Sequence, residues 1–142
     1  MKKFVFLFVA ISLLSVSSFV SAGGHTLLLH VDVTETSFNS ILAQNDGAVS
    51  FNVVGSFDGG TFRCWGWIDG PPGVGEGSVS QVFTFDDGRG MIMTQGIEGG
   101  LLAITGGTGD FNNLRGDALQ SFTGPIDSFD FTIEFVGKGA GF

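Results

Sequence analysis

Tyrosine is absent from this sequence of 142 residues, and cysteine and basic residues are scarce. The single cysteine, Cys64, excludes an internal disulfide, so the core and the backbone hydrogen bonds must stabilise the fold. Six lysines and arginines stand against fourteen acids, which gives a formal net charge of −8 at pH 7. An acidic chain without a basic stripe repels phosphate groups, so we expect neither nucleic acid nor an anionic membrane surface as a partner.

No apolar run is long enough to cross a membrane comfortably as a helix, and the longest one, near the N-terminus, has the pattern of an export signal. Lys2 and Lys3 precede an apolar run that ends near Val16, and small residues follow it. This order is typical of a cleaved signal peptide, and the run is short for a membrane span. We therefore expect a signal peptide at 1–22 and one domain at 23–142, exported to the periplasm or out of the cell with a formal charge of −10.

The rest of the chain is rich in glycine, with 24 residues, and alternates apolar with other residues in about eight short segments. These lie near 26–34, 48–57, 61–69, 77–85, 91–95, 101–105, 114–122 and 129–136. No stretch of eleven or more residues has a helical period with caps. Successive strands with short loops favour a meander, and eight strands remove both edges by closing. We predict an all-β fold, a closed antiparallel eight-stranded barrel.

A barrel of this size holds either its own side chains or one small ligand. The alternation predicts apolar residues and glutamines that face the interior, where a ligand would bind. These candidates are Phe83, Phe85, Met91, Met93, Phe131 and Phe135, with the amides Gln81, Gln95 and Gln120. A buried amide must find a partner, so the glutamines hydrogen-bond a ligand, an ordered water or one another, and structural use is favoured.

His30 and Asp32 share one face of the first segment. They form either an acid–base pair that lines a cavity or a polar stripe that faces solvent. Leu29 and Val31 already supply an apolar face, which favours the stripe. Cys64 is expected at a buried strand position, and the alternative is a thiol that reacts or pairs between chains.

Gly106, Gly107 and Gly109 are expected to form a tight structural turn, with positive φ angles that only glycine adopts easily, and Phe111 is expected to fold back as a plug. A nucleotide site is excluded because the lysine of a phosphate-binding loop is missing and no helix follows. The turn acids fit no calcium-loop pattern, so no metal site is predicted.

Residues 101–111, Leu-Leu-Ala-Ile-Thr-Gly-Gly-Thr-Gly-Asp-Phe, with Leu-Arg-Gly-Asp-Ala at 114–118, resemble the allene oxide cyclase and dirigent-protein barrel superfamily. Residues 88–96 look like the preceding strand of that family, which ends in Gln-Gly. The resemblance implies an eight-stranded barrel, often trimeric, with an apolar cavity and no metal or organic cofactor. It transfers no catalytic residue to this chain. The block is also similar to that of small exported bacterial proteins without an assigned activity.

Two functions follow from these patterns. The first is an exported barrel that binds a small apolar molecule, with a cyclase-like or dirigent-like activity. The second is a non-catalytic structural or interaction protein, whose barrel is filled by its own side chains. Sixteen phenylalanines in so short a chain make a filled interior credible. The interior volume discriminates between them.

Overall fold

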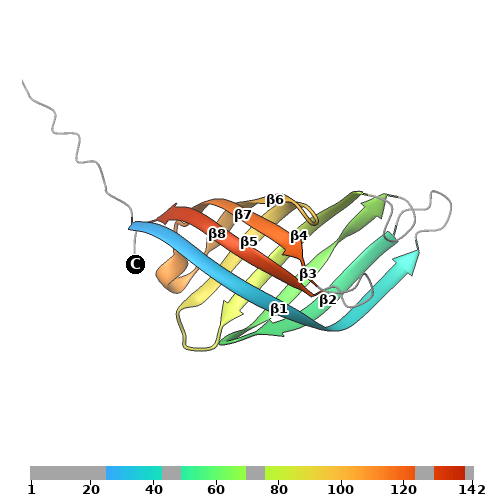
Figure 1. Cartoon of the computed structure of the whole chain (residues 1–142), viewed down its shortest axis with the longest axis horizontal. Helices are drawn as coiled ribbons and strands as arrows, with labels where there is room; N and C mark the ends of the chain where they lie inside the picture. Colours follow the sequence, from blue (N-terminus) through green and yellow to red (C-terminus); the bar gives the residue numbers. More distant parts are fainter. Residues whose placement is uncertain (1–24, 43–48, 70–75, 124–129, 140–142) are drawn as a thin grey trace, which may run out of the picture.

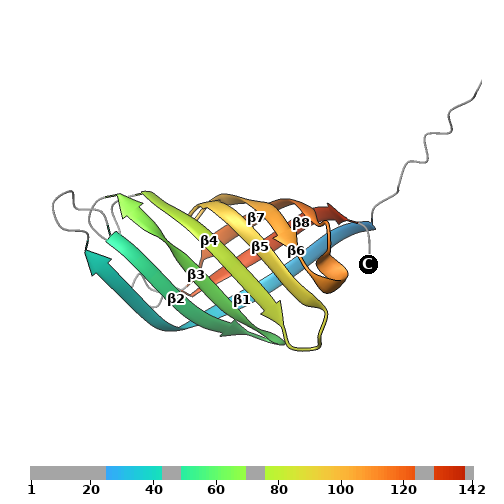
Figure 2. The same cartoon turned by 180° about the vertical axis from the view of Figure 1, so that it is seen from behind.

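The computed structural model describes residues 25–42, 49–69, 76–123 and 130–139, which form one closed antiparallel barrel with its strands in sequence order (Figure 1, and from behind in Figure 2). The strands are β1 (His25–Leu42), β2 (Val49–Phe57), β3 (Gly60–Asp69), β4 (Glu76–Phe85), β5 (Gly90–Ile97), β6 (Leu101–Gly107), β7 (Arg115–Phe122) and β8 (Phe131–Gly139), with a single 3-10 turn, η1 (Gly109–Phe111), before β7. The predicted eight-stranded barrel is confirmed.

The predicted signal peptide at 1–22 lies outside the described residues. Within the described ranges, no helix is long and apolar enough to span a bilayer.

β1 closes the barrel because its two halves pair with different neighbours. Its first half pairs with β8 as far as Val33, opposite Phe131, and its second half pairs with β2 from Thr34 onward. The register shifts beside Thr36, whose hydroxyl donates to the carbonyl of Val54 at 3.0 Å. This bulge lets one strand bend from one neighbour to the other, which is how a tilted sheet closes. It also explains why the apolar alternation predicted a strand that stops at Thr34.

The two ends of the barrel differ. The end that carries η1, here called the η1 end, also holds the turn at 58–59, the turn at 86–89 and the start of β1 (Figure 1). The opposite end, here called the Glu98 end, holds the turn from Glu98 to Gly100. Asp58, Asp86 and Asp87 occupy the turns of the η1 end.

The core is one cluster of inward side chains that runs along the barrel axis. Phe111 is 2% exposed, so the predicted plug at the η1 end is confirmed. The glycine block differs from the prediction, because Gly106 and Gly107 end β6 and only Gly109 has a positive φ, +62°. The strand continues through Gly106 and Gly107 because β6 carries a bulge there that keeps them paired with β5.

Candidate functional site

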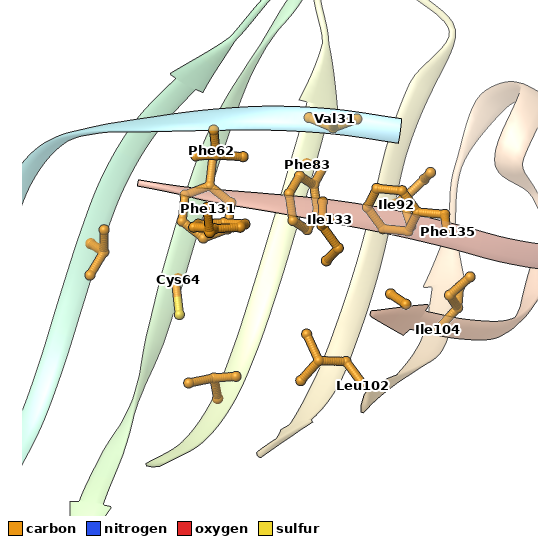
Figure 3. Close-up of a cluster of buried hydrophobic side chains, with 14 of the residues drawn as sticks. Val31, Phe62, Cys64, Phe83, Ile92, Leu102, Ile104, Phe131, Ile133 and Phe135 are labelled. Carbon is orange, nitrogen blue, oxygen red and sulfur yellow. The ribbon is translucent and has the colours of Figure 1, made fainter. Parts of the chain in front are cut away.

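The middle of the barrel is filled by a layer of phenylalanine rings. Phe83 is fully buried, and its ring centroid lies 5.0 Å from those of Phe62 and Phe135. Phe131 completes the layer at 5.0 Å from Phe62. Figure 3 shows these side chains pointing inward from β3, β4 and β8, with Ile133 between them. The centroid distances are those of contacting aromatic rings, so the protein itself occupies this part of the interior.

A second ring cluster closes the η1 end. Phe85 lies 4.8 Å from Phe111 and 5.3 Å from Phe57, measured between ring centroids. The guanidinium of Arg89 lies 4.8 Å from the centroid of Phe85 and covers it from outside. Phe57 also contacts Phe83 at 6.2 Å, so the two clusters are continuous. The interior positions predicted for Phe83, Phe85, Phe131 and Phe135 are therefore confirmed, while their use by a ligand stays a prediction.

The interior face of β5 was predicted wrongly. Met93 is 38% exposed, Gln95 faces solvent and Met91 is half-buried, while Ile92 and Thr94 point inward. The connection between β4 and β5 has four residues, 86–89, which places Gly90 opposite Phe85 and therefore the even-numbered residues inside. Residues 91–93 form an unbroken apolar run, so alternation alone could not fix the phase.

Two of the three predicted glutamines meet inside the barrel. Gln81 is 1% exposed and donates through Nε2 to Oε1 of Gln120 at 3.1 Å, and it accepts from the hydroxyl of Thr94 at 2.9 Å. Gln120 also accepts from the backbone N–H of Gly99 at 3.3 Å. In the described part of the chain, no buried side-chain nitrogen or oxygen lacks a partner. The amides thus bond one another, which is the structural use expected from the sequence.

We expect Gln81→Leu to lower the free energy of unfolding by about 1–3 kcal/mol, since it removes a partner from both the Thr94 hydroxyl and the Gln120 amide in a buried site. Chemical denaturation measures the change. Gln95→Leu is the matched control, because Gln95 lies on the exposed face of β5, and it should stay within about 0.5 kcal/mol. Equal effects of the two variants would contradict a buried network.

Glu98 is a polar group that the sequence analysis missed. An added Cβ on the inward-facing Gly77 would lie 3.0 Å from a carboxylate oxygen of Glu98 and 3.6 Å from Ile68. The carboxyl therefore folds over the wall at the mouth of the Glu98 end, and desolvation there raises its pKa above the ordinary 4.5. No sequence signal distinguishes this turn residue from a solvated acid, since its burial depends on the neighbouring Gly77.

The raised pKa of Glu98 predicts a pH dependence of stability. The folded state keeps the proton to a higher pH than the unfolded chain, so the contribution of this residue to stability falls as the pH rises through 4.5 toward the raised pKa. Glu98→Gln removes this loss. We expect the stability of the variant to increase relative to that of the original protein as the pH rises above 4.5, measured by denaturation at each pH. Parallel pH profiles would contradict the burial of this carboxyl.

An open pocket of about 280 Å³ lies at the η1 end beside β1. Its apolar lining residues are Leu29, Val31, Phe57 and Phe85. Its polar lining residues are His30, Asp32, Asp58 and Arg89. Nε2 of His30 lies 3.0 Å from the carboxylate of Asp32, and both side chains are more than half exposed. His30 and Asp32 thus form the solvent-facing stripe favoured by the sequence, and they border the pocket from outside.

Charge at this pocket is partly paired. The backbone N–H of Arg89 donates to the carboxylate of Asp87, and so does its guanidinium. These hydrogen bonds, the backbone one above all, lower the pKa of the Asp87 carboxyl. Nδ1 of His30 also lies 3.7 Å from the carboxylate of Glu134.

Across the described ranges, no group of three or more histidine, cysteine, aspartate or glutamate residues is placed to hold a metal ion. Cys64 is 2% exposed on β3, which confirms its predicted burial.

The class that these observations define is a small all-β barrel with a ring-filled core. No protein-family model and no curated protein matches the chain. Among solved structures, it is similar to pyocyanin demethylase, with a TM-score of 0.57 and 18% sequence identity over 78% of this chain and 99% of that chain. At this identity the likeness shows the barrel fold alone.

Proposed function

We propose that this protein is an exported, non-catalytic binding protein that uses its filled barrel as a rigid scaffold and acts through its outer surface. The observation that carries the proposal is the ring layer around Phe83, where contacting phenylalanines occupy the space that a ligand would need. The amides of Gln81 and Gln120 support it, because they are bonded to each other and to Thr94. A ligand in the interior would have to break contacts that the folded chain already makes.

A second candidate function is the binding of a small apolar molecule at the pocket of the η1 end. The pocket supports it, because Leu29 and Phe57 supply apolar side chains in a lining that is mostly polar, and the polar groups can orient a ligand. The fold also occurs in pyocyanin demethylase, whose name describes an enzyme that modifies a small molecule. Cyclase-like or dirigent-like chemistry belongs to this candidate, as does the superfamily relationship indicated by the glycine block.

Self-association is part of both candidates. The family that the chain resembles is often trimeric, and several large apolar side chains on the outer wall are about half exposed or more, among them Leu101, Leu119 and Val136. Apolar side chains that lie together on the outside of a small protein mark a contact surface. Sedimentation or light scattering of the purified protein would give the number of copies.

Thermal unfolding with a panel of unsaturated fatty acids and phenolics tests the choice between the two functions. A compound that binds only the folded state must raise the melting temperature in proportion to the logarithm of its concentration. The filled-scaffold proposal predicts no shift across the panel. A concentration-dependent rise that disappears in Phe57→Ala would instead establish the second candidate, because Phe57 lines the pocket at the η1 end.

A further inference from the structure

Two tryptophans stand next to each other on the outer wall of β3. Trp65 and Trp67 are 44% and 59% exposed, although tryptophan is a residue that proteins usually cover. They are two residues apart on one strand, so both side chains leave the same face and their Cα atoms are about 7 Å apart. They are the only two tryptophans in the sequence. Nothing in the ring-filled core explains their position.

The neighbours of both indoles across the sheet are small and polar. In the strand register these neighbours are Asn52 and Ser80 beside Trp65, and Ser50 and Ser78 beside Trp67. Gln95 extends the polar row to β5, where its amide donates to the hydroxyl of Ser80 at 3.0 Å. Short side chains on both flanks leave the large indoles raised above the surface around them. The arrangement combines flat apolar rings with hydroxyl and amide groups that both donate and accept.

This face carries little charge on a strongly acidic protein. The outward residues at 50–56 of β2, 78–84 of β4 and 91–97 of β5 are uncharged. On β3, Arg63 and Asp69 lie one on each side of the tryptophan pair, and Glu76 at the start of β4 pairs with Asp69 in the strand register. The whole chain has a formal charge of −8. An anionic polymer would therefore be repelled by the molecule, and among the described outward residues a cationic polymer would find only the carboxylate of Asp69 beside the indoles. A neutral ligand fits this surface.

We propose that the outer face of β2, β3 and β4 binds a neutral glycan chain, with the indoles of Trp65 and Trp67 stacked on sugar rings. The C–H groups on one side of a pyranose ring carry a slight positive charge, which suits the negative face of an indole. The sugar hydroxyls need hydrogen-bond partners when they leave water, and Asn52, Ser78 and Ser80 supply them. A purely apolar partner would leave those side chains without partners. The inference rests on the proposed function, in which the outer surface is the part that binds.

Indole fluorescence of the purified protein gives a direct test. Because the sequence has two tryptophans and no tyrosine, indole emission reports on this face alone. The titrants are neutral oligosaccharides of glucose, xylose and N-acetylglucosamine, an acidic oligogalacturonate, phosphatidylcholine vesicles, and the protein itself at rising concentration. We expect a saturable blue shift with at least one neutral oligosaccharide and no response in the other three arms.

Variants place the effect on the two indoles. Trp67→Ala should weaken glycan affinity about tenfold or more, and Trp67→Phe should restore part of it, since a smaller ring still stacks. Leu28→Ala is the matched control, because Leu28 is an exposed apolar residue on β1 at 76% exposure, and it should leave affinity unchanged. Native gels containing neutral polysaccharide give the same comparison for Trp65→Ala, and circular dichroism checks the fold of every variant.

The proposal is overturned if no neutral oligosaccharide gives a saturable change, if only vesicles, the acidic sugar or self-association change the emission, or if Trp67→Ala binds as well as the original protein. If the glycan proposal fails, the filled-scaffold proposal still holds as long as no compound of the fatty-acid and phenolic panel raises the melting temperature. A rise in melting temperature with a compound of that panel contradicts the filled-scaffold proposal, whatever the result of the oligosaccharide titrations. The two readouts therefore separate the two failures.

Discussion

Phe83→Ala is expected to lower the free energy of unfolding by about 3–5 kcal/mol, because it empties the centre of the ring layer. Phe83 is fully buried and contacts Phe62 and Phe135 at 5.0 Å, so its neighbours cannot collapse into the space without losing contacts of their own. For a domain of this size, such a loss lowers the melting temperature by roughly 10 °C or more. Chemical denaturation and calorimetry measure both quantities.

The control for Phe83→Ala is Phe122→Ala, which removes the same ring from a side chain that is 47% exposed. Among the described residues, the ring of Phe122 lies 6.4 Å from that of Phe131, measured between centroids, so we expect a loss below about 1 kcal/mol. If the two variants lower the free energy of unfolding by the same amount, the layer at the centre of the barrel is not closely packed. That result would favour a ligand site in the interior.

Gly109→Ala is expected to lower the free energy of unfolding by at least about 2 kcal/mol, which is a large effect for one methyl group added to an exposed turn. Gly109 has a φ of +62°, and a Cβ at this position would lie 2.2 Å from the carbonyl oxygen of Arg89. That carbonyl accepts the backbone N–H of Asp110 at 2.8 Å, which holds η1 against the turn after β4. The methyl group would separate the two segments, and Phe111 would lose its position as a plug.

Gly106→Ala is the matched control within the same glycine block. Nothing lies within 4 Å of the Cβ that it would add, and the residue has no positive φ. We expect a change within about 0.5 kcal/mol in thermal or chemical unfolding. A loss at Gly106 as large as the loss at Gly109 would show that the block is sensitive for a reason other than backbone geometry.

Alternation predicted the barrel and most of its interior because strands β2, β4 and β8 keep one strict period of two. Phe83, Phe131 and Gln81 were placed correctly for this reason. The same rule failed on β5, where Ile92 is the middle one of three consecutive apolar residues and only the length of the preceding turn decides the face. Phase depends on turn geometry, which a single sequence specifies weakly.

The candidate site was less predictable than the fold. The partners of Gln81 are Thr94, on a strand of misassigned phase, and Gln120, which is 39 residues away, so their bonds depend on barrel closure. Glu98 is covered only because Gly77 leaves room on the facing strand. The tryptophans of β3 are plain in the sequence, but their exposure and polar neighbours follow from strand register, which no local pattern shows.

A barrel whose centre is filled by its own rings is the central claim, and benzene tests it most directly. We predict that saturating benzene leaves the melting temperature of the original protein unchanged and raises that of Phe83→Ala, since only the variant has a dry cavity for it to enter. Phe83→Leu, which opens a smaller space, should show a smaller rise. Equal stabilisation of the original protein and Phe83→Ala would contradict the claim, because it would reveal open space in the original interior.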